Sequence, residues 1–171
     1  KTYYSREHVS VCMEEFSCTI EKVEQGLLYR LQSRFAPQET EFYFGDQEEM
    51  GLGVRVAKPL TEKAGGRLLD SKGRRGAKEI WSQAAEWCDY SGAIDGHSVG
   101  ATIICHPQNF RPSWFHARNY GLMVANPFGR KAMEKGLTSR VFVGADSPLV
   151  LRFAVLLHDG ATRAEIEACH I

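Results

Sequence analysis

Apolar and polar residues alternate with a period of two through most of this 171-residue chain. Such alternation is typical of strands with one buried face, and it leaves little room for long amphipathic helices. Many short strands joined by turns predict an all-β fold, an antiparallel β-sandwich or a jelly roll. The predicted strands are a hairpin over 17–35, then 40–45, 51–57, 98–106, 113–125, 139–144 and 148–158.

Turn and cap residues support this interpretation at two places. Asp95-Gly96 is a hairpin signal just before the strand predicted over 98–106. Thr162 and Glu165 have capping-box spacing, which predicts a short helix near the end of the chain. We therefore expect the helices to be one or two short ones at the margins of the sandwich.

Two further segments are harder to interpret. Asn126 precedes Pro127, and Gly136 follows ten residues later, which predicts a short helix capped by Asn126. The segment 77–88 suits either a helical face or a strand, and we interpret it as a strand.

Composition excludes two classes of partner. The 21 basic and 21 acidic residues balance to a formal net charge of zero, whereas a nucleic-acid-binding protein usually has a basic surplus. The longest apolar run, 149–157, contains an arginine and is far shorter than the roughly 20 residues of a membrane span. We expect a soluble protein, and the sequence leaves both the periplasm and the cytoplasm open.

Five cysteines are scattered without a CxxC pair. The odd number leaves at least one thiol unpaired within the chain. We interpret the cysteines as free thiols, with a Cys12–Cys18 disulfide as the alternative.

The stretch HPQNFRPSWFHARNYG, residues 106–121, carries the candidate chemistry. A regular strand over 113–125 would place four side chains on one face, namely Trp114, His116, Arg118 and Tyr120. An aromatic ring can stack on a sugar, a guanidinium can hold a carboxylate or a diol, and an imidazole can move a proton near neutral pH. The alternative is that these side chains are structural.

A carboxylate partner is expected in FGDQEEMGLGVRV, residues 44–56, where Gly51 and Gly53 leave room above the predicted strand. The competing interpretation is a charged turn with an internal Glu–Arg ion pair. We predict a catalytic set of His116, Arg118 and Glu49. The predicted ligand-binding set is Trp114, Tyr120, His106, Asn109, Arg111 and Glu48.

Metal binding is not predicted. The histidines show neither HxH nor HExxH spacing, so we expect neither a metal site nor a cofactor.

Four stretches resemble a known family: FYFGDQEEMGLGVRVA, AEWCDYSGAIDG, HPQNFRPSWFHARNYGLMVANPFG and LRFAVLLHDG. The chain is similar, from about Val11 onwards, to the bacterial PmoA family, an uncharacterised group also labelled methane oxygenase PmoA. The methane monooxygenase subunit of that name is an integral membrane protein, so the oxygenase label does not fit this chain.

The resemblance implies a soluble β-sandwich from bacteria rich in carbohydrate-degrading genes. Family members carry a histidine-rich N-terminal segment that is missing here. Residues 1–171 are therefore expected to form a single sandwich domain, the C-terminal part of a longer family domain. Missing strands would leave a sheet edge at which a homo-oligomer could form.

These observations predict a carbohydrate-active or carbohydrate-binding β-sandwich protein. Its ligand would be a small molecule or an oligosaccharide, and an enzyme would be a sugar lyase, hydrolase or epimerase. The alternative is a non-catalytic module for assembly or adhesion. The sequence alone does not choose between an enzyme and a binding module.

Overall fold

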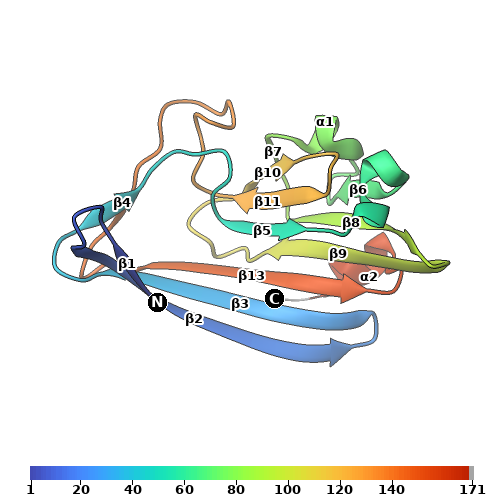
Figure 1. The fold of residues 1–171 in the computed structure, drawn as a ribbon, viewed down its shortest axis with the longest axis horizontal. Helices are drawn as coiled ribbons and strands as arrows, with labels where there is room; N and C mark the ends of the chain where they lie inside the picture. Colours follow the sequence, from blue (N-terminus) through green and yellow to red (C-terminus); the bar gives the residue numbers. More distant parts are fainter. Residues whose placement is uncertain (170–171) are drawn as a thin grey trace.

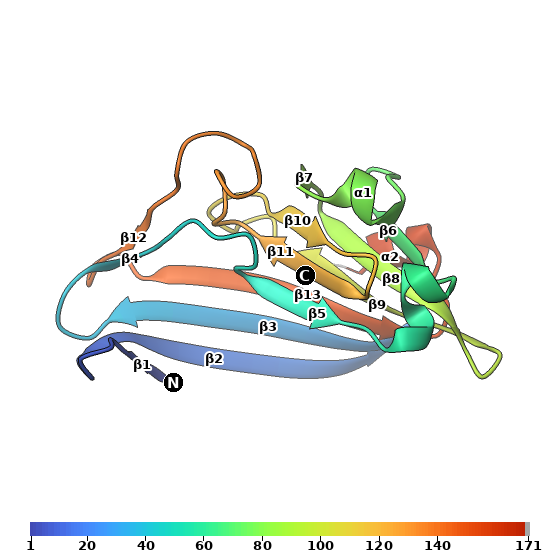
Figure 2. The same cartoon turned by 45° about the horizontal axis from the view of Figure 1, so that its top comes forward.

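The computed structural model describes residues 1–169, which form a sandwich of antiparallel sheets (Figure 1). Strands make up about 50% of the structure and helices 9%, which confirms the all-β prediction. A seven-stranded sheet packs against a four-stranded sheet, and a two-stranded ribbon lies at one end (Figure 2). No helix within residues 1–169 has the length and apolar character needed to cross a membrane.

The large sheet has the strand order β1-β2-β3-β13-β9-β8-β6. Its strands are β1 (Thr2–Tyr4), β2 (Ser10–Val23), β3 (Gly26–Pro37), β13 (Leu149–His158), β9 (His97–Cys105), β8 (Trp87–Ile94) and β6 (Arg67–Asp70). The small sheet contains β5 (Leu52–Arg55), β11 (Leu122–Asn126), β10 (Trp114–Ala117) and β7 (Gln83–Ala84), in that order. The ribbon pairs β12 (Val141–Val143) with β4 (Phe42–Phe44).

Helical segments are short. They are the α-helices α1 (Gly76–Ile80) and α2 (Arg163–Glu167) and the 3-10 turns η1 (Lys58–Leu60) and η2 (Glu62–Ala64). The predicted capping box is confirmed, because the Thr162 hydroxyl accepts from the Glu165 N–H and the Glu165 carboxylate accepts from the Thr162 N–H.

Hairpins form where the turn residues predict them. Asp95 and Gly96 have φ values of 51° and 82°, the positive pair of a type I′ turn, and they join β8 to β9. The hairpin predicted over 17–35 is also confirmed, as β2 and β3. Strand β13, predicted as a buried strand, lies between β3 and β9 and pairs with both.

The single strand predicted over 113–125 is wrong. The chain instead forms a hairpin of β10 and β11, with a turn at residues 118–121. Gly121 has φ 97°, and a Cβ there would lie 3.1 Å from the Val56 carbonyl oxygen. Only glycine tolerates this backbone conformation and this close approach. The alternation of faces therefore stops at Ala117 and restarts at Leu122.

Two other predictions need correction. The segment 77–88 is helical at its start and extended afterwards, because the last residue of α1, Ile80, is fully buried in the core. Residues 127–136 contain turns and no α-helix. Asn126 still caps the first of these turns, since its Oδ1 accepts from the N–H groups of Phe128 and Gly129.

All five cysteines are free thiols, as interpreted from the sequence. Cys12 and Cys18 both lie in β2 and are therefore about 20 Å apart along the strand. A disulfide needs Cα atoms within roughly 7 Å, so the alternative of a Cys12–Cys18 bridge is wrong.

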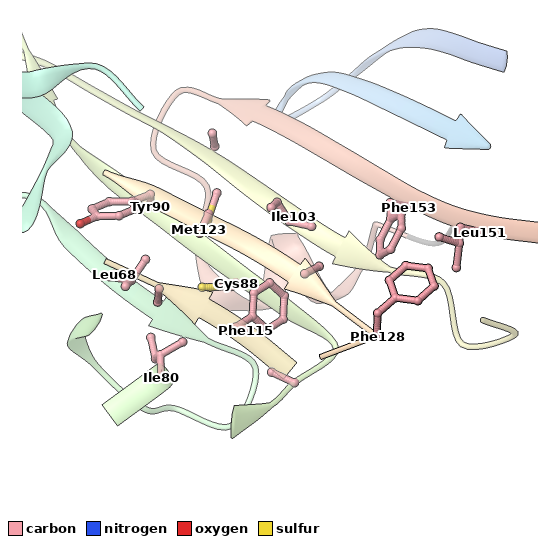
Figure 3. Packing of buried hydrophobic residues seen from close by; sticks show 14 of the residues in the cluster. Leu68, Ile80, Cys88, Tyr90, Ile103, Phe115, Met123, Phe128, Leu151 and Phe153 are labelled. Carbon is pink, nitrogen blue, oxygen red and sulfur yellow. The ribbon is translucent and has the colours of Figure 1, made fainter. Parts of the chain in front are cut away.

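The main core lies between the two sheets (Figure 3). Burial of this apolar surface supplies the main drive for folding. Its members include Leu68, Ile80, Cys88, Tyr90, Ile103, Phe115, Met123, Phe128, Leu151 and Phe153.

The small sheet leaves part of the large sheet uncovered. Phe16 and Ile20 on β2 are 50% and 58% exposed. The outer edge of β2 is paired only near its start, where β1 reaches Met13. Such an edge can pair with another chain. A homo-oligomer at this edge stays a prediction.

The opposite face of the large sheet contains a buried polar cluster under the segment that leads into α2. The Nδ1 of His158 accepts the Ala161 N–H at 2.9 Å, so Nε2 carries the hydrogen and donates to Asp89 at 2.8 Å. Asp89 also accepts hydrogen bonds from Thr102 and Ser91. The cluster ties the last strand to β8 and β9.

Asp89→Asn should destabilise the fold by about 2–4 kcal/mol, because the new amide would face three donors with only one acceptor oxygen. Urea denaturation measures this change. Asp159→Asn, on an exposed residue one position beyond His158, should stay within about 0.5 kcal/mol of wild type. Equal stability of the two variants would show that the cluster does not support the fold.

Candidate functional site

The outer face of the small sheet brings together part of the predicted site. Phe115 and Ala117 point into the core, so Trp114 and His116 of β10 point outwards. Val124 lies opposite His116 on β11, and Asn126 lies opposite Trp114. The shared face that was predicted for Trp114 and His116 is confirmed.

The loop from Gly45 to Gly51 crosses this outer face and is fixed at both ends. Asp46 accepts hydrogen bonds from three backbone N–H groups, those of Lys131, Ala132 and Ser139. These bonds hold the pKa of Asp46 below its usual value, although burial opposes them. At the other end, a Cβ on Gly51 would lie 2.1 Å from the Ala125 carbonyl oxygen, so the glycine permits close backbone contact.

Asn126 holds the middle of the same loop. Its Nδ2 donates to the carbonyl oxygens of Gln47 at 2.7 Å and Glu48 at 2.9 Å. Its Oδ1 accepts from the turn that follows β11. This fully buried amide therefore joins two loops and sets the position of Glu48 and Glu49.

Glu48 and Glu49 lie on either side of the His116 ring. The Nδ1 of His116 is 3.1 Å from Glu48 Oε1, and its Nε2 is 3.4 Å from Glu49 Oε1. The His116 side chain has no exposed surface, whereas those of Glu48 and Glu49 are 37% and 59% exposed. Within residues 1–169, neither ring nitrogen finds a partner with hydrogen-bond geometry. The site is thus a buried imidazole beneath two carboxylates that reach solvent.

The environment of His116 favours its neutral form. Burial lowers the pKa of His116, and Arg118 lowers it further, against the opposing effect of Glu48 and Glu49. A neutral imidazole has one N–H and one lone pair, so it can donate to only one of the two carboxylates. The other carboxylate faces the lone pair unless it carries a proton. A neutral His116 therefore cannot satisfy both carboxylates at once.

Glu48 also binds two other side chains. Arg118 donates from Nη2 to Glu48 Oε1 at 2.7 Å, and Trp81 donates from Nε1 to the same oxygen at 2.8 Å. The Arg118 guanidinium lies 6.0 Å from the centre of the Trp81 ring. Arg118 is 37% exposed, so it is neither a buried strut nor an unpaired pocket residue.

Trp81 was missed by the sequence prediction. It follows α1, in a segment that we interpreted as a strand, and no spacing relative to residues 106–121 pointed to it. The helix end and the contact with Glu48 that mark Trp81 are features of the tertiary structure, and no signal in the sequence pointed to them.

The other predicted ligand residues lie elsewhere. Tyr120 is in the 118–121 turn, beside Arg55 rather than beside Arg118. Both polar atoms of the Asn109 side chain bond to the backbone of Arg152, and Asn109 is therefore structural. The placement of Tyr120 on the His116 face is wrong, because the strand ends at Ala117. Asn109, predicted to bind the ligand at the mouth of the site, instead extends the edge of β13.

Arg111 and His106 are at the end of the sandwich. Arg111 lies over the Trp114 ring at 5.5 Å and donates to the carbonyl oxygen of Pro127. The Nδ1 of His106 accepts the Gln108 N–H at 3.1 Å. Both residues line a separate cavity of about 890 Å³.

Acidic and imidazole groups do not converge on a metal position. Within the described part of the chain, no group of three or more His, Cys, Asp or Glu residues is placed to hold a metal ion.

Residues 2–170 match a family described as a family of unknown function, DUF6807. The chain belongs to the DUF6807 family. No curated protein and no solved structure matches it. The description of the DUF6807 family assigns no activity to its members. The resemblance to the PmoA family stays a prediction.

Asn126→Ala in this DUF6807 chain should destabilise the fold by about 2–4 kcal/mol, because it leaves several buried backbone groups without partners. This exceeds the 0.5–2 kcal/mol expected from a simple cap residue. Thermal or urea unfolding measures the change. Asn119→Ala, in the exposed turn, is the matched control. A loss no larger than that of the control would contradict the role given to Asn126.

The lowered pKa of His116 predicts a pH dependence of stability. In the unfolded chain histidine takes up a proton near pH 6.5, whereas the folded protein keeps His116 neutral to lower pH. This contribution to stability is fully present above about pH 6.5 and is lost as the pH falls. As the pH falls from about 7.5 to 5, wild type should therefore lose more free energy of unfolding than His116→Asn does. Val124→Ala, on the same face, should give a difference that does not change with pH.

Proposed function

We propose that the outer face of the small sheet binds a carbohydrate and performs acid–base chemistry on it. The observation that carries this proposal is the buried His116 ring, with both nitrogens close to carboxylates and neither hydrogen-bonded. Buried polar atoms without partners are rare and call for a functional explanation. An imidazole within reach of an exposed carboxylate is the pair of groups that acid–base catalysis uses.

Glu49 is the group that would touch the ligand. At 59% exposure, its side chain is the most exposed of the three. His116 is buried, so it would act through Glu49, by supplying or accepting the proton that Glu49 exchanges with a sugar hydroxyl or an acidic C–H. These roles fit a lyase, a hydrolase or an epimerase alike.

Arg118 and the tryptophans would bind the ligand. Arg118 is half-exposed and uses Nη2 for Glu48, which leaves other donors of its guanidinium for a sugar hydroxyl or carboxylate. Trp81 offers a ring beside this group, Trp114 lies farther along the same face with Arg111 over its ring, and rings stack on the C–H face of sugars. Donors for hydroxyl groups, rings for C–H faces and a carboxylate for proton exchange together support a polyhydroxylated ligand.

The second candidate is a structural module. It is favoured by the number of bonds that tie the 45–51 loop to the sheet, through Asp46, Asn126 and Glu48. In that case the same polar groups would only hold the loop in place, and no ligand would compete for them.

A binding experiment separates the two candidates. Sugars and sugar acids are titrated into the ¹⁵N-labelled chain, and the indole N–H signal of Trp81 is followed. We expect a binder among them, with affinity weakened about tenfold in Arg118→Ala through loss of a charged hydrogen bond. Arg118→Ala should lose only about 1 kcal/mol of stability or less, because its ion pair is half-exposed.

Glu49→Gln should remove any turnover while leaving binding within a few-fold of wild type. Glu24→Gln, in the exposed turn between β2 and β3, is the control for loss of a carboxylate. If no sugar or sugar acid moves the Trp81 signal, the carbohydrate proposal fails and the structural module stands.

A further inference from the structure

A cavity lies away from the His116 site, between α2, the start of β8 and the loop after β9. Its volume is about 890 Å³. Apolar walls come from Ile104, Pro107, Pro112 and Ile166. Charged groups around it are Lys72, Arg111, Arg163, Glu86 and Glu167. A cavity with apolar walls and a few polar groups is the usual form of a small-molecule site.

Trp87 places an unused donor on the wall of this cavity. The residue is 3% exposed, and its indole Nε1 has no hydrogen-bond partner among residues 1–169. A buried indole N–H normally finds an acceptor. Ser113 lies on the same wall, and its buried hydroxyl faces the Cys105 thiol. An indole N–H can only donate, so whatever binds here must present an acceptor atom.

The two carboxylates of the cavity are already engaged. Glu86 accepts from the Lys72 ammonium at 2.7 Å and from the Ser71 hydroxyl. These two bonds lower the pKa of Glu86 to about 2. Glu167 accepts from Arg163 at 2.8 Å. Three cations thus surround two ion-paired carboxylates.

The cations retain donors that these bonds do not use. Lys72 has three ammonium hydrogens, and Glu86 takes one of them. Among residues 1–169, the Arg111 guanidinium donates from Nη1, to the carbonyl oxygen of Pro127 and to the hydroxyl of Ser139. The balance of charge and of hydrogen-bonding groups at the cavity therefore favours a ligand that brings negative charge and acceptor oxygens.

We propose that this cavity binds a small organic carboxylate. One carboxylate oxygen would accept the Trp87 N–H, the cations would balance the charge, and the apolar part of the ligand would pack against Ile104 and Ile166. The proposal is independent of the carbohydrate site, because Trp87 lies on the outer face of the large sheet and Trp81 lies over the small sheet.

The three tryptophans make the test direct. Their indole N–H signals in a ¹⁵N–¹H spectrum are assigned with Trp→Phe variants. Hexanoate, benzoate and glucuronate are then titrated to about 10 mM, a range that detects millimolar dissociation constants. Hexan-1-ol, benzyl alcohol and glucose are the uncharged counterparts. We expect at least one carboxylate to shift the Trp87 signal in a saturable way, and its counterpart to leave that signal in place.

Two variants check the contacts. Trp87→Phe keeps an aromatic ring and removes the donor, and it should weaken binding about five- to tenfold, as for one lost hydrogen bond. Lys72→Gln should weaken binding by a similar factor and reduce its dependence on salt. Binding to Lys72→Gln is followed at the Trp87 signal, and binding to Trp87→Phe at the ligand's own signals. Trp81→Phe, on the other face, should leave the affinity unchanged.

The proposal is overturned if no carboxylate moves the Trp87 signal, or if the uncharged counterparts bind as well as the carboxylates. A shift of the Trp81 signal alone would support the carbohydrate site and count against this one.

Discussion

The architecture depends on the position of β13 at the centre of the large sheet. This strand pairs with β3 over ten residues and with β9 over six. Leu151 and Phe153 face the core between the sheets, and Leu156 and His158 face the opposite side of the large sheet, where His158 bonds to Asp89. A central strand must have both its backbone edges and both its faces satisfied. The chain can therefore complete the sheet only when its last strand inserts between two strands formed by much earlier segments.

The candidate site depends on this sandwich indirectly, through the small sheet and the 45–51 loop. The small sheet rests on the β9-β8-β6 half of the large one, and its outer face would be an ordinary polar surface without the 45–51 loop. Asn126 and Asp46 hold the loop there. The consequence is a histidine with no exposed surface beneath two carboxylates that remain in solvent. Burial lowers the pKa of His116, so its ring stays neutral to a lower pH than a free imidazole would.

Sequence patterns predicted the strands well where turn chemistry is local. The type I′ turn at Asp95-Gly96 and the capping box at Thr162 need no information beyond a few neighbouring residues. The single strand over 113–125 was wrong because Gly121 folds the chain back against Val56, a residue 65 positions earlier. Tyr120 was lost from the predicted site for this reason, and Trp81 was missed because helix and strand periodicities overlap in its segment.

The amino-acid sequence by itself determined the all-β class, most of the strands, and the pairing of His116 with a glutamate from residues 48–49 as a candidate. Alternation and turn residues encode the class and the strands within short windows, whereas the candidate pairing of His116 with a glutamate rested on residue type alone. Only the tertiary structure decided that His116 is fully buried, that Arg118 is held by Glu48 and stacked near Trp81, and that Arg111 faces a different cavity. These features come from contacts between segments about 30 to 70 residues apart. Burial and charge pairing at such distances depend on how the sheets pack, and no local pattern records that.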